Sequence, residues 1–237
     1  MNDATSIPLI DRTTGILSET IGKFVASFDF DKVPDTVIDR AKFNILDAIG
    51  IGFASVGYDF AQRLTSALLE IGGEGNQPVI GMDIRLTQRD AAHLNGTLIH
   101  GLDYDDTHSG AVVHTSASAF PTMLAAGLAS GASGRKALGA FLIASETASR
   151  IGAAASGGFH QRGFHPTGVV GAFGSAIGAG YLYNLDPNQL INAQGIALSQ
   201  AAASLEFLED GAWTKRNHPG WASVCGQTAA MMARQDR

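Results

Sequence analysis

One stretch of the sequence limits the possible folds more than any other. HPTGVVGAFGSAIGAGYLYNL carries no charged residue over positions 166–185, and small residues recur along it at Gly171, Gly174, Ser175 and Gly178. A bilayer-crossing helix needs about 20 mostly apolar residues, whereas many positions of this segment are occupied by glycine. Spaced small residues let a second helix approach closely, in soluble cores as well as in membranes. We therefore predict a buried core helix here in preference to a membrane span.

The rest of the chain shows helical spacing of its apolar residues and no repeated alternation of the strand type. Pro34 stands where a proline suits a helix start, and Thr87 precedes a further helical run with Asp90 three positions later. The sequence predicts an all-α fold in a single helical domain over residues 1–237. The expected helices cover residues 11–28, 34–57, 61–73, 88–103, 116–130, 135–155, 168–184, 187–207 and 215–234, with a short β-like piece at 77–81.

The second of these helices carries large apolar side chains at helical spacing. They are Phe43, Leu46, Ile49 and Phe53. Since residues three and four apart lie on one face of a helix, these four side chains are expected to form its inner face against the core.

Composition and charge exclude several classes of protein. Only 16% of the residues are charged, fewer than the roughly 25% of an ordinary domain, and the net charge is −6. No basic stripe exists, so we expect no nucleic-acid partner. The one cysteine, Cys225, excludes an internal disulfide. The start MNDATSIPLIDRTTG has early acidic residues and no apolar run of the signal-peptide type, which predicts a cytoplasmic protein.

The few ionisable groups are gathered in three polar segments, and the first is HGLDYDDTHSGAVVH, from His100 to His114. Three aspartates and three histidines share its fifteen residues, and Asp103, Asp106 and His108 lie at its centre. Such a loop often caps helices and is solvated. Long apolar helices on both sides would draw it inward, however, where carboxylates and imidazoles perturb one another's pKa. We favour a functional site over a capping loop.

A metal site at these aspartates is an open alternative. Aspartate and histidine side chains could bind Mg²⁺ or Zn²⁺, and DYDDTH is faintly similar to the aspartate-rich motifs of prenyl-diphosphate enzymes. Such a magnesium site needs basic residues for the phosphates and a second acidic helix, and the sequence has neither. No HExxH motif or cysteine ligand set supports zinc. We expect no metal, and a Mg²⁺-dependent enzyme stays as an alternative.

The second and third polar segments each precede an expected helix. GGFHQRGFHPTG brings Arg162 and His165 to the start of the glycine-rich helix, where backbone amides favour an anion. EDGAWTKRNHPGWAS places Lys215 and His218 directly before the last helix, where cations oppose the helix dipole. An unfavourable local placement suggests another purpose, such as binding an anion. A helix cap and an ordinary basic surface loop are the alternatives.

Together the three segments carry a resemblance. LNGTLIHGLDYDDTH with the later His114, RGFHPTGVVGAFGSAIGAGYLYNLD and GAWTKRNHPGWASVCGQTAAMMA resemble, in this order, the MmgE/PrpD family. The family's His-Pro-Ser reads His114-Thr115-Ser116 here, and the loop before it is one residue shorter. The resemblance implies a helical domain that normally joins an α/β lid, usually in a dimer. It covers the first half of a family member, so we expect a helical domain that lacks the lid.

The resemblance also implies an activity. The family contains 2-methylcitrate dehydratases, cis-aconitate decarboxylases and iminodisuccinate epimerases, which move a proton next to a carboxylate of a small polycarboxylate. It implies Asp103, His114, His165 and Lys215 as catalytic residues. We expect His108, Arg162 and His218 to bind substrate, with Lys215, His165 and His218 as cations and Asp103 orienting a histidine.

We expect no cofactor, because this chemistry needs neither a metal nor an organic group. The expected partner is a second copy in a homodimer, or a separate chain that supplies the lid. The rival hypothesis is a truncated, non-catalytic helical module that binds an anion or a dimer partner.

Overall fold

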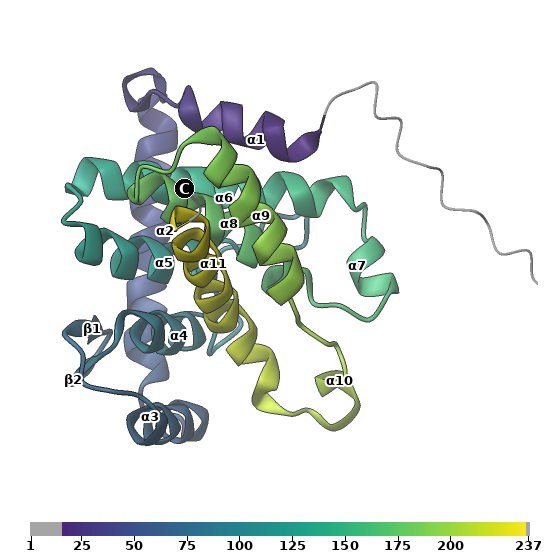
Figure 1. Ribbon diagram of the computed structural model, residues 1–237. Coiled ribbons are helices and arrows are strands. Elements are labelled where there is room, and N and C mark those ends of the chain that lie inside the picture. Colours follow the sequence, from purple (N-terminus) through teal and green to yellow (C-terminus); the bar gives the residue numbers. More distant parts are fainter. Residues whose placement is uncertain (1–15, 236–237) are drawn as a thin grey trace, which may run out of the picture.

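The computed structural model describes residues 16–235, and helices dominate its regular structure (Figure 1). The all-α fold expected from the sequence is confirmed. The elements, in chain order, are α1 (Leu17–Ala26), the 3-10 turn η2 (Phe30–Lys32), α2 (Asp35–Ser55), α3 (Asp59–Ile71), β1 (Gln77–Val79), β2 (Met82–Leu86), α4 (Gln88–Ile99), α5 (Ser116–Ser130), α6 (Gly134–Ala154), α7 (Gly158–Gln161), α8 (Pro166–Leu182), α9 (Pro187–Gln200), α10 (Phe207–Asp210), the 3-10 turn η3 (Trp213–Asn217) and α11 (His218–Arg234).

The glycine-rich helix α8 forms the centre of the structure, with α5, α6, α9 and α11 packed around it. Its glycines are required by close contact with neighbouring backbone. A Cβ on Gly174 would lie 2.5 Å from the carbonyl oxygen of Ala144 in α6, and one on Gly226 of α11 would lie 2.5 Å from the backbone nitrogen of Ala176. The predicted buried core helix is confirmed. None of the helices within residues 16–235 is long and apolar enough to cross a membrane.

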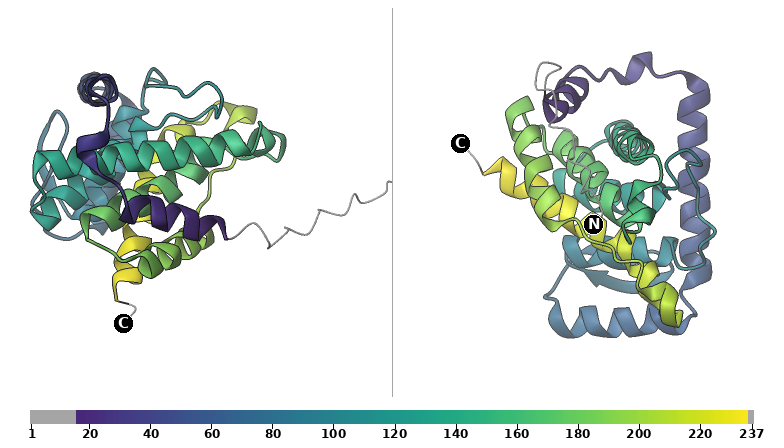
Figure 2. Two further views of the ribbon diagram at one scale, coloured as in Figure 1. Left: turned by 90° about the horizontal axis from the view of Figure 1, so that it is seen from above. Right: turned by 90° about the vertical axis from the view of Figure 1, so that its right-hand side faces the viewer.

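The large apolar residues of α2 contradict the expected inner face. Phe43, Leu46 and Phe53 are 65%, 64% and 61% exposed. The residues that α2 buries are mainly small ones, among them Ala41 and Ala48. The helix runs along one edge of the molecule (Figure 2), so small residues allow its close contact with the core and the large side chains are left outside. The predicted inner face of α2 is therefore wrong for these three residues, whereas Ile49, the fourth, packs against the core.

Several helices also begin or end at residues other than those expected from the sequence. The helix expected over 187–207 ends at Gln200, because residues 203–205 are extended and bond to the loop before α8: the amide of His165 donates to the carbonyl of Ala203. The last helix begins at His218 after the turn η3, and α4 ends at Ile99, four residues before its expected end. Of the first expected helix, residues 11–15 lie outside the described residues. The sequence did not predict α7, α10 or β2.

A small hairpin fixes the position of α4. The expected β-like piece contains β1, which pairs antiparallel with β2. Asn95 of α4 bonds to the turn of this hairpin, accepting from the amide of Ile80 at 2.8 Å and donating to the carbonyl of Pro78 at 3.0 Å. Thr87 caps α4 as predicted, since its side chain accepts from the amide of Asp90. These bonds fix the helix whose last turn leads into the polar cluster described below.

Candidate active site

Four histidines from different parts of the chain form one cluster. His100 follows the last turn of α4, His114 precedes α5, His165 caps α8 and His218 begins α11. The ring centroid of His100 lies 4.7 Å from that of His114 and 5.6 Å from that of His165. His165 and His218 face each other with their Nδ1 atoms 3.1 Å apart, so one of these nitrogens must donate to the other. Phe207 of α10 packs edge-on against this second pair.

An ion pair lies beside this cluster. The Lys215 ammonium is 2.6 Å from both carboxylate oxygens of Asp103. The next residue, Arg216, donates from Nε to the carbonyl of Gly101 at 2.7 Å and thereby ties η3 to the loop that carries Asp103. Asp103 has a positive φ of 55°, a conformation that costs free energy for a non-glycine residue and is concentrated at functional sites. This backbone conformation belongs to the turn that brings the carboxylate to Lys215.

Asp103 also approaches two of the histidines. Its Oδ1 lies 3.7 Å from Nε2 of His114 and 3.9 Å from Nε2 of His100. Burial alone would raise the pKa of the Asp103 carboxyl, but the hydrogen bond and the positive charge of Lys215 bring that pKa below its ordinary value. Asp103 is therefore an anion near neutral pH. The expectation that it orients a histidine differs from this geometry, since its short contacts go to Lys215.

A second carboxylate does orient a histidine, and the sequence had not singled it out. The Asp105 side chain is fully buried, and its two oxygens lie 3.0 and 3.1 Å from Nδ1 of His100, which is also fully buried. His114 is the other neighbour of this carboxylate, at 3.6 Å from its Nδ1. The signal that could have revealed the pair is the apolar run that precedes His100, which predicts burial of the residues that follow it.

Two of the histidines are neutral near pH 7. Burial and then the positive charge of His100 lower the pKa of His165 to about 2, and the same two causes lower that of His218 to about 4. Positive charge on Lys215 acts in the same direction on both. The structure thus differs from the expectation that these two histidines serve as cations beside Lys215.

Sequence comparisons with known proteins identify relatives of this chain. The family model of the MmgE/PrpD N-terminal domain matches residues 19–237. The chain belongs to the MmgE/PrpD family. A cis-aconitate decarboxylase of Aspergillus terreus is 29% identical over 226 residues, which cover 93% of this chain and 46% of that protein. A cis-aconitate decarboxylase of Homo sapiens is 31% identical over 223 residues, covering 92% and 46%. The chain therefore spans about half the length of these relatives.

The residues that the MmgE/PrpD resemblance implied as catalytic lie together in the structure. Asp103, His114, His165 and Lys215 come from separate segments and share the polar cluster. His218 joins them through His165. Their catalytic roles stay predictions, because geometry alone shows proximity.

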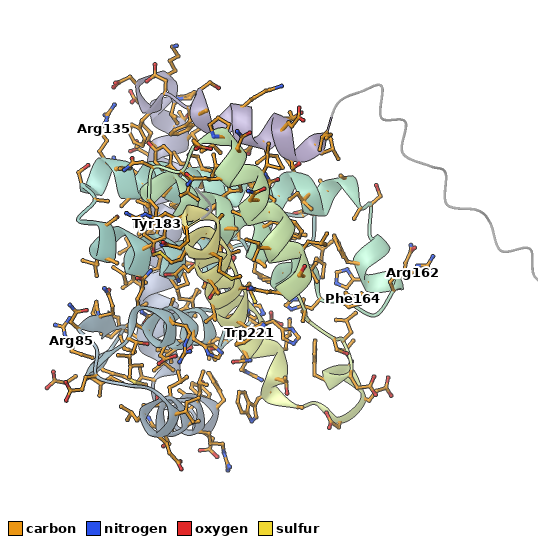
Figure 3. The ribbon with its side chains drawn as sticks, viewed as in Figure 1. Arg85, Arg135, Arg162, Phe164, Tyr183 and Trp221 are labelled. Carbon is orange, nitrogen blue, oxygen red and sulfur yellow. The ribbon has the colours of Figure 1, made fainter. Side chains whose placement is uncertain are left out.

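Two expected substrate-binding residues lie elsewhere. His108 is exposed, and its Nδ1 accepts from the amide of Ala111 at 3.1 Å, which stabilises its own loop. Arg162 is exposed at the end of α7, and its side chain points away from the helices (Figure 3). Among the described residues, neither His108 nor Arg162 forms a hydrogen bond or ring contact with the histidine cluster, so a role in binding would require substrate to reach outside the cluster.

One part of this MmgE/PrpD site could also hold a metal ion. His100, Asp103, Asp105 and His114 each offer one ligand atom, and these atoms lie within 4.8 Å of one another. Two imidazoles with carboxylates suit a transition metal better than Mg²⁺, which prefers oxygen ligands. Asp103 is already bound by the Lys215 ammonium, which a metal would have to displace. A metal ion at these four residues and the Lys215 ammonium would therefore compete for the same carboxylate.

Proposed function

We propose that this chain forms the polycarboxylate-binding wall of an MmgE/PrpD lyase or isomerase that moves a proton next to a carboxylate without a metal. The observation that carries the proposal is the Lys215 ammonium, paired with Asp103 beside four histidines. A reaction of this class places negative charge on carboxylate oxygens, and a preorganised cation stabilises that charge.

The Asp103 carboxylate marks the position of a substrate carboxylate. Lys215 binds both of its oxygens, and about half of the Asp103 side chain is exposed, so an incoming anion can compete for the ammonium. Exchange of one carboxylate for another keeps the charge on Lys215 compensated. Charge-assisted hydrogen bonds of this kind are about twice as strong as neutral ones.

His114 is the residue that we assign to proton transfer. Its side chain is 15% exposed, whereas those of His100 and Asp105 are fully buried, and its Nε2 faces Asp103. Thr107 Oγ1 and the carbonyl of Asp105 both lie 3.3 Å from its Nδ1, which fixes the ring. When CO₂ leaves a substrate, the electron pair stays on carbon and His114 delivers a proton there. In a dehydration, His114 takes the proton from carbon, the pair of electrons forms the double bond as the neighbouring C–O bond breaks, and the hydroxide leaves as water with the proton that His114 then carries.

The relatives suggest the first substrate to test. These relatives are cis-aconitate decarboxylases, so cis-aconitate is the leading candidate for this chain, with 2-methylcitrate next. Because the chain spans about half of their length, turnover by residues 1–237 alone is part of the proposal. Binding without turnover, by a non-catalytic module or one that needs a lid from another chain, is the alternative.

Proton NMR of the protein with each candidate acid tests the proposal. We expect loss of the vinyl signal of cis-aconitate, or collapse of the methyl doublet of 2-methylcitrate to a singlet as the proton on the neighbouring carbon is lost, and no effect of EDTA on the rate. Lys215→Ala should lower the rate at least 100-fold, while Lys42→Ala, a surface lysine paired with Asp39, should not. Turnover that requires added metal would favour the cluster of two histidines and two aspartates as a metal centre. Binding with no turnover of any acid would favour the non-catalytic module.

We also propose that the exposed face of α2 forms a homodimer. Phe43, Leu46 and Phe53 are exposed and share one side of α2 by their helical spacing, and contiguous exposed apolar patches mark contact surfaces. Size-exclusion chromatography with light scattering should give a dimer for the wild type and a monomer for the double variant Phe43→Glu/Phe53→Glu. A wild-type monomer at tens of micromolar protein would contradict the dimer and leave the site unaffected.

A further inference from the structure

The position of Lys215 depends on the residues that follow it in the turn η3. The backbone hydrogen bonds of η3 stay within the turn and the start of α11, and in the described part of the chain none joins it to α4 or to the loop after α4. Side chains attach the turn instead. Arg216 donates from Nε to the carbonyl of Gly101 at 2.7 Å. Oδ1 of Asn217 lies 2.6 Å from Nε2 of His93 in α4. The place of the Lys215 ammonium therefore depends on side-chain contacts made by the next two residues.

The Arg216 side chain lies between an aromatic ring and the end of a helix. Its guanidinium carbon is 5.2 Å from the ring centroid of Phe60 in α3, within the range of a cation–π contact. Phe60 is buried, so its ring is a fixed surface. The Gly101 carbonyl lies two residues beyond the end of α4, where a cation is stabilised by the helix dipole and by the unpaired carbonyls. A cation that is unfavourable at the start of α11 is therefore favourable at the end of α4.

The turn that accepts this bond also carries Asp103. A Cβ on Gly101 would lie 2.5 Å from Cζ of Phe60, so the backbone of this turn packs directly against the ring on which Arg216 lies. Asp103 follows two residues later with its positive φ of 55° and presents its carboxylate to Lys215. Arg216 therefore joins the residue next to the ammonium to the turn next to the carboxylate.

We propose that Arg216 is a positioning residue, which holds the Lys215 ammonium and the turn of Asp103 at a fixed spacing. The ion pair alone is a weak anchor, because its two side chains are 25% and 51% exposed and such pairs lose attraction to solvent screening and side-chain entropy. The planar guanidinium of Arg216 is contacted both at its edge and on its face, which leaves it few alternative positions. Arg216 thus supplies the rigidity that the ion pair lacks.

The other side-chain bond of η3 has a different effect. Asn217 binds His93, and His93 lies in α4 itself, so this bond fixes the end of the turn to the helix. A Cβ on Gly220 would lie 2.1 Å from the carbonyl of His93, because α11 also crosses α4 in direct backbone contact there. Neither contact reaches the loop after α4. Among the described residues of η3, only Arg216 makes a hydrogen bond to the backbone of that loop.

The consequence for binding rests on the proposed function. When a substrate carboxylate takes the place of Asp103 at Lys215, the ion pair no longer joins η3 to the loop after α4. The Arg216 bond to Gly101 then remains as the hydrogen bond between these two segments in the described part of the chain. It keeps the ammonium directed at the same point, so the site needs no reorganisation when the anion binds.

Amine labelling with a limiting amount of an acetylating reagent tests the inference without any substrate. Peptide mapping by mass spectrometry gives the acetylation rate of Lys215 relative to that of Lys23, an exposed lysine of α1. In the wild type this ratio should be low, because Asp103 binds the Lys215 ammonium. Arg216→Met keeps an unbranched stem but has no donor for the carbonyl of Gly101, so the ratio should rise several-fold.

Two further variants separate geometry from charge and from stability. Arg216→Lys keeps the charge without the planar fork, so its ratio should lie between those of the wild type and Arg216→Met. Arg85→Met removes an arginine from an exposed position in β2 and should leave the ratio unchanged (Figure 3). A loss of stability alone would lower the melting temperature of Arg216→Met without changing the ratio. A wild-type ratio in Arg216→Met would overturn the inference, and if that variant does not fold, a wild-type ratio in Arg216→Lys would do so.

Calorimetric titration with cis-aconitate gives the second readout. Arg216→Met should weaken binding about 10-fold, the size expected for loss of one hydrogen bond from a charged group. In Lys215→Ala the same substitution should cause no further loss, because a positioning residue acts only through the group that it positions. An equal loss in Lys215→Ala would mean that Arg216 binds the anion itself, and would overturn the inference. A wild type that binds no acid but shows the expected labelling ratios would contradict the proposed function alone.

Discussion

The two halves of α8 stabilise the structure in opposite ways. The half from Gly174 to Leu182 is buried among apolar residues, and its glycines bring α6 and α9 close to its backbone. The end at His165 lies among imidazoles and near two carboxylates, where two of the rings stay neutral. Steric fit therefore governs the C-terminal half of α8, and protonation governs its N-terminal end at His165. Each should respond to a perturbation that leaves the other unaffected.

Acid should produce the largest change in the free energy of unfolding, and it should act only through the polar end of α8. In the unfolded chain a histidine takes up a proton near pH 6.5, but in the folded protein His218 does so at about 4 and His165 at about 2. Between pH 6.5 and 4 the unfolded state binds more protons, so the free energy of unfolding should fall as the pH falls, by several kcal/mol in total. Asp103, whose pKa is lowered, adds a further loss in the same direction only below about pH 4, where the unfolded carboxyl takes up a proton first.

Urea unfolding at a series of pH values measures this effect. His218→Gln should flatten the acid limb by about half, and His160→Gln, at an exposed position, should follow the wild type. An acid limb that is equally steep in His218→Gln and the wild type would show that the cluster does not exclude protons.

A larger side chain in the other half of α8 should cost about 3 kcal/mol at all pH values. Gly174→Leu places its Cβ 2.5 Å from the carbonyl of Ala144, which is backbone and cannot move aside without shifting α6. Gly195→Ala in α9 is the control, because a Cβ there meets nothing within 4 Å and should stabilise the helix by up to about 1 kcal/mol. Equal melting temperatures for Gly174→Leu and the wild type would mean that α8 is not packed as described.

The smallest change in stability is expected for substitutions on α2, because its large apolar side chains are exposed and not buried in the core. Phe43→Ser removes a ring that is 65% exposed, so the stability of the monomer should change by less than about 0.5 kcal/mol. Calorimetry at low protein concentration, where a dimer would dissociate, measures this change. A loss of 3 kcal/mol or more in the free energy of unfolding would instead support the buried position that the sequence predicted for these residues.

The sequence allowed much of the fold to be predicted, for identifiable reasons. Helical spacing and caps such as Thr87 are local signals, so most helices and the buried α8 followed from them. The face of α2 did not follow, because the spacing of Phe43 and Phe53 shows that they share a side and does not show what covers it. The break after Gln200 depends on bonds to the distant loop before α8, which no local pattern contains.

The site shows the same division. The resemblance grouped Asp103, His114, His165 and Lys215, and the structure places them together. It did not reveal that Asp105 holds a buried histidine, because three aspartates within the four residues DYDD do not show which carboxylate turns inward. Nor could residue type show protonation: a histidine near a helix start is read as a cation until its neighbours and burial are known.

The most direct test of the central claim, that Lys215 binds a substrate carboxylate in this cluster, is a melting series with cis-aconitate. A ligand that binds only the folded state raises the melting temperature with its concentration. We expect this rise for the wild type and for Lys42→Ala, whose lysine pairs with Asp39 on the surface, and we expect most of it to be lost in Lys215→Ala. Protection of Lys215→Ala equal to that of the wild type would contradict the claim, because the anion would then bind elsewhere.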